Sequence, residues 1–322
     1  MRVLRGIHYR VARPTCLALG VFDGVHRGHR RVIGATVRQS GPLGATPAVL
    51  TFDPHPAAIV GSGKAPPLLT TTDEKIETIR ELGVGLVVVA AFDRALASMP
   101  AERFVSEVLV RRLRARCVVV GSGWRFGAGG KGDPSLLRRI AADYGFGVTT
   151  VPAVLAGRSP VSSTRIRKLL LEGGAEEAAR LLGRRYSIVG PVVPGDGLGR
   201  QLGFPTANLH LPPEKLLPAD GVYACWASGL GRGTGSSPPA PRLWPALCYI
   251  GTRPTVAASG VRRAEVHLLR RRGPLGAPGS VLRAELISRL RPDRRFPSTR
   301  ALVAQMALDR LRACQLLGLQ ES

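Results

Sequence analysis

The sequence predicts an α/β domain with a doubly wound parallel sheet, followed by a small antiparallel β-barrel domain with a C-terminal helix. Three observations predict this fold class. Up to about residue 153, continuous apolar runs alternate with helical patterns, which is typical of a parallel sheet covered on both faces. From about residue 186, short strand-like runs are broken by Gly and Pro, and no helical pattern returns until the end of the chain. The 322 residues also exceed the roughly 250 to 300 that one hydrophobic core usually holds, so we expect domains over residues 1–184 and 185–322.

The first domain is expected to consist of strands that helices separate. Apolar, β-branched runs predict strands at residues 16–22, 47–52, 85–92, 117–121 and 148–154. Helical patterns lie between them at residues 26–39, 73–82, 101–113 and 133–145, and two more follow at 162–174 and 175–183. Ligands of such a sheet bind at the carboxyl ends of the strands, where the strand order reverses. The polar segment after the first strand falls at such a place.

The second domain is expected to be built from short strands and one terminal helix. The strand-like runs are residues 186–193, 221–228, 244–251, 264–269 and 281–290, and the helical pattern is 298–318. Residues 228–241 and 270–280 are rich in Gly, Ser and Pro, so we interpret them as flexible insertions.

Charge is the unusual feature of the composition. The formal net charge is +24, and 41 of the 46 basic residues are Arg. Such a field favours anionic partners, either nucleic acid or phosphorylated small molecules. An equally weighted interpretation is a bias across the whole chain, in which Arg and Ala replace Lys and Ile.

Cysteine spacing and the amino terminus both favour a cytoplasmic protein. The five cysteines have no CxxC spacing, so we interpret them as reduced core residues. The first residues lack the apolar region of a signal peptide, and no run reaches the roughly 18 apolar residues that span a bilayer. We therefore expect neither secretion nor contact with a membrane.

The segment GVFDGVHRGH follows the first expected strand and contains two histidines at the start of a helix. A polyphosphate binds well at a helix N-terminus, and two imidazoles can hold charge that develops on an α-phosphate during in-line displacement. A metal-binding pair or two surface histidines are alternatives for His26 and His29. The candidate nucleotide-binding residues of this segment are Gly20, Asp23, Gly24 and Gly28.

Ser163, Thr164 and Arg167 open a later expected helix. Their hydroxyls, the free backbone N–H groups and a bidentate guanidinium suit phosphate oxygens. Taken alone, the two Ser and the Thr also fit an ordinary helix cap.

Four separated motifs resemble the FMN adenylyltransferase domain of bacterial bifunctional riboflavin kinase/FAD synthetases. They are GVFDGVHRGH, TFDPHP at 51–56, LLTTTDEK at 68–75 and VSSTRIR at 161–167, in the order that the family has. The resemblance implies that FMN attacks the α-phosphorus of ATP. It implies further that His26 and His29 stabilise the transition state, while Ser163, Thr164 and Arg167 hold the triphosphate.

A second constellation, GDGLGRQLGFPTANL, covers residues 195–209. Its backbone N–H groups can wrap phosphates and Arg200 can neutralise them, although a plain turn is an alternative for the glycines. Thr206 and Asn208 are two residues apart, so both can face one site when the chain is extended, and their oxygens suit Mg²⁺. The candidate nucleotide-binding residues here are Gly195, Gly199, Arg200 and Gly203.

The string GRxLGFPTANL resembles the riboflavin kinase signature, and GVYA, YIGTRPT and AEVHLL follow it as in that family. The resemblance implies that Glu265 is the catalytic base and that Thr206 and Asn208 coordinate magnesium and ATP. It thus implies a transferase with Mg²⁺, with ATP as co-substrate, and with riboflavin, FMN and FAD as substrates or products. Without the family, an exposed strand residue opposite Arg262 or Arg263 is the preferred interpretation of Glu265.

Two segments depart from the family pattern. Gly123 stands where the family has Asp or Asn, and Arg270–Arg272 replace an acidic and aromatic segment. A relative with a weakened kinase or a modified flavin substrate is therefore an alternative. A less favoured alternative is a nucleic-acid-binding regulator with decayed sites, because no nucleic-acid motif is present and only 5% of residues are aromatic.

Overall fold

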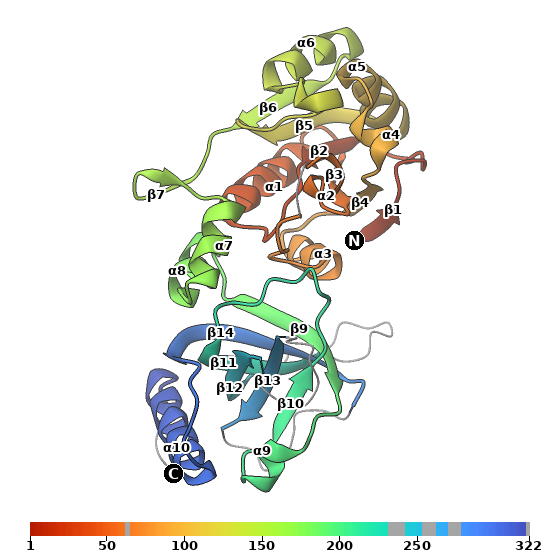
Figure 1. Ribbon diagram of the computed structural model, residues 1–322. Coiled ribbons are helices and arrows are strands. Elements are labelled where there is room, and N and C mark those ends of the chain that lie inside the picture. The colour runs from red at the N-terminus through yellow and green to blue at the C-terminus, as the bar shows by residue number, and fades with distance from the viewer. Residues whose placement is uncertain (62–64, 231–241, 253–261, 270–277, 320–322) are drawn as a thin grey trace. The chain divides into compact units, whose positions relative to one another are not determined.

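The computed structural model describes residues 1–61, 65–230, 242–252, 262–269 and 278–319 (Figure 1). Its contacts divide the chain into two compact units, Met1–Ser163 and Thr164–Ser322. The first unit holds a six-stranded sheet and the second a closed six-stranded barrel, which confirms the predicted fold class. The predicted boundary between catalytic domains, after residue 184, stays a prediction. Arg270–Arg272 and most of the two expected insertions lie outside the described residues.

All strand pairs of the first sheet are parallel, in the order β1-β4-β3-β2-β5-β6. Five of these strands match the predicted runs: β2 (Thr15–Leu19), β3 (Thr46–Asp53), β4 (Leu86–Ala91), β5 (Ala115–Gly121) and β6 (Gly147–Val151). The edge strand β1 (Arg2–Arg5) was not predicted, since its two Arg obscure the apolar pattern of a short strand. The strand order reverses at β2, which lies between β3 and β5.

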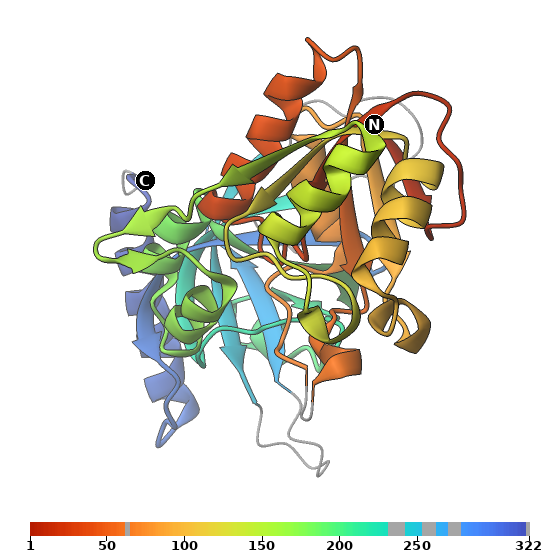
Figure 2. The same ribbon diagram turned by 90° about the horizontal axis from the view of Figure 1, so that it is seen from above.

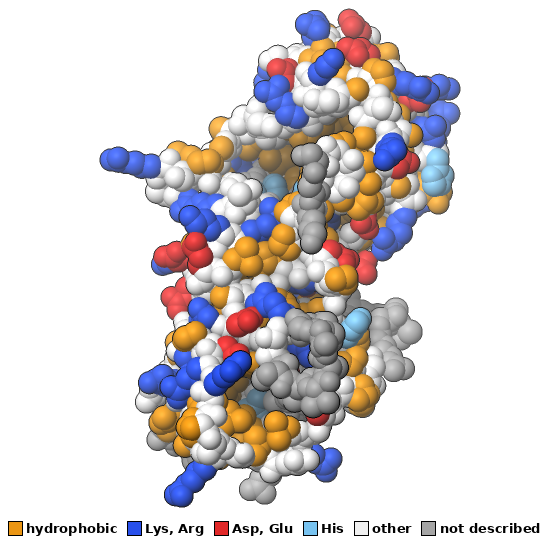
Figure 3. Space-filling view, viewed as in Figure 1, with side chains coloured by type: hydrophobic (Ala, Val, Ile, Leu, Met, Phe, Trp, Pro, Cys, Tyr) orange, Lys and Arg blue, Asp and Glu red, His pale blue; other side chains and the backbone are white. Residues whose placement is uncertain are grey.

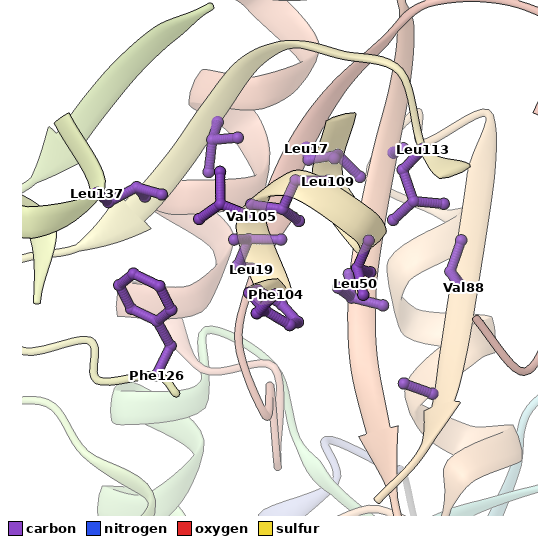
Figure 4. Close-up of a cluster of buried hydrophobic side chains, with 14 of the residues drawn as sticks. Leu17, Leu19, Leu50, Val88, Phe104, Val105, Leu109, Leu113, Phe126 and Leu137 are labelled. Carbon is purple, nitrogen blue, oxygen red and sulfur yellow. The ribbon is translucent and has the colours of Figure 1, made fainter. Parts of the chain in front are cut away.

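Side chains alternate between two apolar layers, so helices cover both faces of the sheet (Figure 2). Leu17 and Leu19 belong to one layer, drawn in Figure 4, and Cys16 and Ala18 to the other. The first layer also contains residues of the π-helix η1 and of α6, and the second contains residues of α1 and α3. The helices of this unit are α1 (Arg27–Ser40), α3 (Thr72–Arg80), α5 (Ala101–Arg103), η1 (Phe104–Arg112) and α6 (Pro134–Tyr144).

The first unit also contains elements that are too short for a hydrophobic period to reveal them. They are α2 (Ala57–Val60), α4 (Arg94–Ala97), the 3₁₀ turn η2 (Ala128–Gly130), β7 (Leu155–Ala156) and β8 (Ser159–Pro160).

The barrel of the second unit is antiparallel and closes in the order β10-β13-β12-β11-β14-β9. Its elements are β9 (Tyr186–Val193), α9 (Leu198–Gln201), β10 (Thr206–Leu209), β11 (Gly221–Leu230), β12 (Trp244–Gly251), β13 (Arg263–Leu268) and β14 (Val281–Pro292). Two helices precede it, α7 (Ser163–Leu171), which begins at the division between the units, and α8 (Ala175–Leu182), which packs on β9 and β14.

The terminal helix α10 (Thr299–Leu316) covers the outside of the barrel, as the sequence predicts. Its Ala313 is buried in a cluster with Val222 and Leu247 of the barrel. Arg291 Nε at the end of β14 lies 2.9 Å from Asp309 Oδ2, and both side chains are almost fully covered. In the part of the chain that the structure describes, no helix combines the length and the apolar character needed to cross a membrane.

Candidate active sites

The loop between β2 and α1 lies at the carboxyl end of a central strand, where the sheet order reverses. Phe22 and Val25 have φ values of 53° and 39°, a region that is costly for residues with side chains. Both side chains are buried in the layer beneath α1. Packing therefore holds the loop in this conformation.

His26 and His29 form the centre of this candidate site. His26 is the N-cap of α1, and the backbone N–H of His29 donates to its Nδ1 at 3.3 Å. The two imidazoles stack with centroids 3.6 Å apart and planes 17° apart. Nδ1 of His29 is buried and has no hydrogen-bond partner among the described residues. Burial, and then the positive charges of His26 and Lys75, lower the pKa of His29 well below its ordinary value, so His29 is neutral at pH 7.

Asp23 connects this loop to the segment before α3. Its carboxylate accepts hydrogen bonds from the backbone N–H of Leu69 at 3.2 Å and of Thr70 at 3.0 Å. The hydroxyl of Thr70 in turn accepts from the N–H of Gly24 at 3.0 Å. The carboxylate thus organises the loop, and its predicted contact with a nucleotide stays a prediction.

Ser163 brings a distant motif to the histidine loop. Its hydroxyl donates to the backbone oxygen of Asp23 at 2.9 Å. A Cβ atom on Gly28 would lie 3.1 Å from His26 Cε1, so only glycine leaves the space beside this ring open. Thr164 and Arg167 continue along α7 in the second unit, and their predicted role in holding phosphates stays a prediction. Gly20 lies against the ring of Phe22, because a Cβ atom on Gly20 would be 3.0 Å from Cζ of that ring.

Lys75 is a buried residue to which sequence reasoning assigned no role. Its ammonium donates to Val21 O at 3.2 Å, to Thr51 Oγ1 at 3.2 Å and to Phe52 O at 3.3 Å. Burial lowers the pKa of Lys75, while the carboxylates of Asp23 and Asp53 oppose that shift. Its position in the motif LLTTTDEK was the available signal, since a Lys on the buried face of a helix needs polar partners.

Gly123, the first departure from the family pattern, lies after the carboxyl end of β5. No heavy atom lies within 4 Å of a Cβ atom built on it. The site therefore has room for the polar side chain that this chain lacks.

In the second unit, the glycine-rich loop after β9 packs directly on two side chains of β10. A Cβ atom on Gly195 would lie 2.1 Å from Asn208 Nδ2, and one on Gly199 would lie 3.2 Å from Thr206 Oγ1. Thr206 and Asn208 alternate with the buried Ala207 and Leu209, so they share one face of the strand. The absence of side chains at the two glycines is thus what allows the loop to lie over this polar face.

The rest of this loop forms one helical turn, α9, between the strands. Arg200 lies in this turn with an exposed side chain, and Gly203 follows it with φ of 82°. Phe204 N donates to Gly199 O at 2.7 Å, which closes the turn. Arg200 thus lies on the same loop as the three glycines of the predicted phosphate site, Gly195, Gly199 and Gly203.

Glu265 on β13 faces the same polar surface. It pairs in register with Asn208, and its Oε2 accepts from Thr206 Oγ1 at 3.3 Å. Only 4% of Glu265 is exposed, which excludes the alternative of an exposed strand residue. Arg262 pairs instead with Asp220, with 2.8 Å between Nε and Oδ1.

The chemistry of this donor set fits a hard divalent cation. A hydroxyl, an amide oxygen and a carboxylate gather beneath a loop whose glycines come close to two of them. Among the described residues, no group of three or more His, Cys, Asp or Glu could hold a metal ion. Thr206 and Asn208 are the residues of this donor set that could hold such a cation.

Comparisons with known proteins match the two parts of the chain separately. Family models match residues 9–165 as FAD synthetase and residues 182–317 as riboflavin kinase. The bifunctional riboflavin kinase/FMN adenylyltransferase of Escherichia coli K12 is 38% identical over 323 aligned positions, which cover 99% of each chain. The protein of that name from Bacillus subtilis 168 is 32% identical and covers 92% of this chain and 90% of its own. A crystal structure of a Streptococcus pneumoniae protein, named a macrolide-efflux protein, superposes with a TM-score of 0.83 at 25% identity and covers 97% of this chain and 98% of that one.

Proposed function

The chain belongs to the bifunctional riboflavin kinase/FMN adenylyltransferase family, and we propose on that premise that each of its two candidate sites performs one of the family's reactions. The protein is a transferase that phosphorylates riboflavin to FMN and adenylylates FMN to FAD. The histidine loop would serve the second reaction and the polar face of β10 and β13 the first.

In the adenylyl transfer, an oxygen of the FMN phosphate attacks the α-phosphorus of ATP, and the bond from that phosphorus to the bridging oxygen breaks to release pyrophosphate. His26 and His29 would stabilise the charge that develops on the α-phosphate. The open space at Gly28 would let the backbone N–H groups at the start of α1 approach the phosphates. Ser163, Thr164 and Arg167 would hold the triphosphate. The stacked imidazoles at the N-terminus of α1 are the observation that supports this assignment.

In the kinase reaction, Glu265 would accept the proton of the ribityl 5′-hydroxyl while that oxygen attacks the γ-phosphorus and ADP leaves. The loop with Gly195, Gly199, Arg200 and Gly203 would surround the phosphates. Thr206 and Asn208 would hold Mg²⁺, which neutralises phosphate charge when it is bound. The 3.3 Å contact between Thr206 and Glu265 supports this proposal, because it brings both roles to one place.

The direct test is incubation of the protein with riboflavin, ATP and Mg²⁺, with the products separated by chromatography. FMN and FAD together are the expected result. FAD from supplied FMN but no FMN from riboflavin would point to a failed kinase, the alternative that Arg270–Arg272 suggest. If neither FMN nor FAD forms, the proposal is wrong. We also propose a cytoplasmic location. We propose further that the substrates are small molecules only, which repeating the assay with added RNA would test.

A further inference from the structure

A second concave site lies in the first unit, at the end of the sheet opposite the histidine loop. This cavity of about 670 Å³ is lined by residues just before β2, at the start of β5 and at the ends of η1 and α6. The histidine loop follows the carboxyl end of β2, whereas Pro14 in the cavity wall precedes its first residue. The five residues of β2 span about 15 Å, so the two sites are distinct. Five arginines line the cavity: Arg10, Arg111, Arg112, Arg114 and Arg116.

The cavity concentrates arginine in a way that the surface in general does not. Lys and Arg are spread over the face shown in Figure 3, so positive charge alone marks no site. Here five guanidinium groups surround one hollow, and its single carboxylate, Glu107, already accepts from Arg103 Nε at 3.0 Å. The cavity is thus a concave site with a large excess of positive charge.

Two of the five arginines build the wall, and three are available to a ligand. Arg112 donates to the backbone oxygen of His8 at 2.9 Å, and Arg114 donates to the backbone oxygen of Ala12. Arg10, Arg111 and Arg116 are exposed, and within the described ranges the guanidinium groups of these three residues form no hydrogen bond or ion pair. Their charge is therefore uncompensated by the protein.

One residue of the cavity wall, Arg114, has an unusual backbone conformation. Arg114 has φ of 50°, the left-handed region that residues with side chains seldom adopt, and it directly follows the C-cap of the π-helix η1. Its N–H donates to Val110 O at 3.1 Å, and its carbonyl accepts from Thr15 N at 3.1 Å. These bonds fix the turn, so the guanidinium groups around it project from a rigid frame.

We propose that this cavity binds a nucleoside di- or triphosphate. Guanidinium groups match phosphate oxygens in a bidentate way, and several of them at one site select a ligand with more than one phosphate. Tyr144, which is 47% exposed, offers an aromatic face on which a base can stack. A volume of about 670 Å³ suits one small molecule, whereas nucleic acid would require an extended basic stripe. A small nucleotide is thus the occupant that the cavity fits.

The test uses ADP and the full chain, with hydrogen exchange as the readout because ADP also binds catalytic sites. ADP should slow exchange in residues 8–14 and 110–116. In the double variant Arg111→Gln and Arg116→Gln, the ADP concentration that gives half of the full protection should rise about a hundredfold, since two charge-assisted contacts are removed. The matched control is Arg38→Gln with Arg139→Gln, which removes the same charge from exposed helical positions outside the cavity. Both variants should make FAD at the parent rate, which shows that the unit is folded.

Three outcomes would overturn the proposal. The first is no protection of these segments by millimolar ADP. The second is an equal loss in the control variant, because the effect would then be one of net charge. The third is protection by a short RNA at lower concentrations than ADP needs, which would make the cavity part of a nucleic-acid surface.

A second variant tests the nucleoside part of the ligand. In Tyr144→Ala, the ADP concentration that gives half of the full protection should rise about tenfold. The concentration of inorganic triphosphate that protects should not change, since only ADP has a base to stack. If ADP protects the parent and the variant equally, the cavity does not recognise the base. The proposal that its ligand is a nucleoside polyphosphate would then be wrong.

Discussion

The two proposed catalytic sites differ in the part of the fold that carries their functional groups. In the first unit, the histidine pair lies on a loop at the end of a parallel sheet, and the nearby Asp23 is occupied by backbone N–H groups. In the barrel, Glu265 lies on the face of a strand beside Thr206. One site thus presents the neutral imidazole of His29 and backbone N–H groups, and the other presents a buried carboxylate.

This difference follows from the two nucleophiles. The FMN phosphate is already ionised at neutral pH, so its site needs groups that stabilise charge but no group that removes a proton. The ribityl hydroxyl must lose a proton to attack, so its site needs a base. Changing one residue at a time should therefore impair one reaction and leave the other intact.

The largest effect is expected at Glu265. In Glu265→Gln, FMN formation from riboflavin should fall about a thousandfold, because the amide cannot accept the proton. FAD formation from supplied FMN should stay within about twofold of the parent, since Glu265 lies in the other unit. Initial rates with each flavin measure both activities. FMN formation near the parent rate would show that Glu265 is not the base.

The reverse separation is expected at His29. In His29→Ala, FAD formation should fall about a hundredfold or more, because a group that stabilises the α-phosphate is lost. FMN formation in the barrel should not change. Thermal unfolding of the variant serves as the control for folding. A variant that makes FAD as fast as the parent would remove His29 from the mechanism.

A smaller effect is expected at Lys75, whose ammonium donates to the backbone oxygen of Val21 at the start of the histidine loop. Lys75→Met should slow FAD formation about tenfold, because two carbonyl groups and a hydroxyl lose their buried donor. Removing its charge should also raise the pKa of His29, which NMR titration can follow. The control Lys75→Arg keeps the charge and should keep the His29 pKa low. An unchanged pKa in Lys75→Met would show that the lysine acts on structure alone.

The low pKa of His29 also predicts how stability depends on pH. Unfolded His titrates near pH 6.5, whereas native His29 takes up a proton only at lower pH. Below about pH 6.5 the unfolded state therefore binds more protons, so the free energy of unfolding falls as the pH falls. His29→Gln should reduce this slope by up to about 1.4 kcal/mol per pH unit. Denaturant unfolding between pH 7 and pH 5 measures the slope, and equal slopes in parent and variant would contradict the assignment.

The smallest effect is expected at Gly123. Because the space around it is open, Gly123→Asn should change stability by less than about 0.5 kcal/mol. If the missing polar side chain limits flavin or nucleotide binding, the KM for FMN or ATP should decrease in the adenylyl transfer and not in the kinase reaction. Unchanged KM values would show that Gly123 does not weaken the binding of FMN or ATP.

The sequence predicted the fold and its motifs well where a pattern was long or distinctive. Strand β9 has the predicted bounds, since an apolar run ends there at a Gly/Pro segment. Strand β10 was not among the predicted strands, because four residues carry too little period, although an extended PTAN segment was expected. The hydrogen-bond partners of single buried polar residues were less predictable. The carboxylate of Asp23 accepts from backbone N–H groups, and the ammonium of Lys75 donates to three buried oxygens. These contacts join residues between 23 and 54 positions apart in the sequence, which no local pattern records.

The open sheet and the closed barrel also differ in their edges. A barrel has no unpaired strand, whereas the parallel sheet ends at β1 and β6 and exposes hydrogen-bonding groups that could pair with another copy. Arginine stands at both of these edges: Arg2 and Arg5 lie in β1, and Arg138 of α6 donates to Thr150 of β6. Bulky like charges repel a second sheet edge that carries the same residues. Part of the arginine excess thus protects this protein from aggregation through its own strands, whatever set the overall composition.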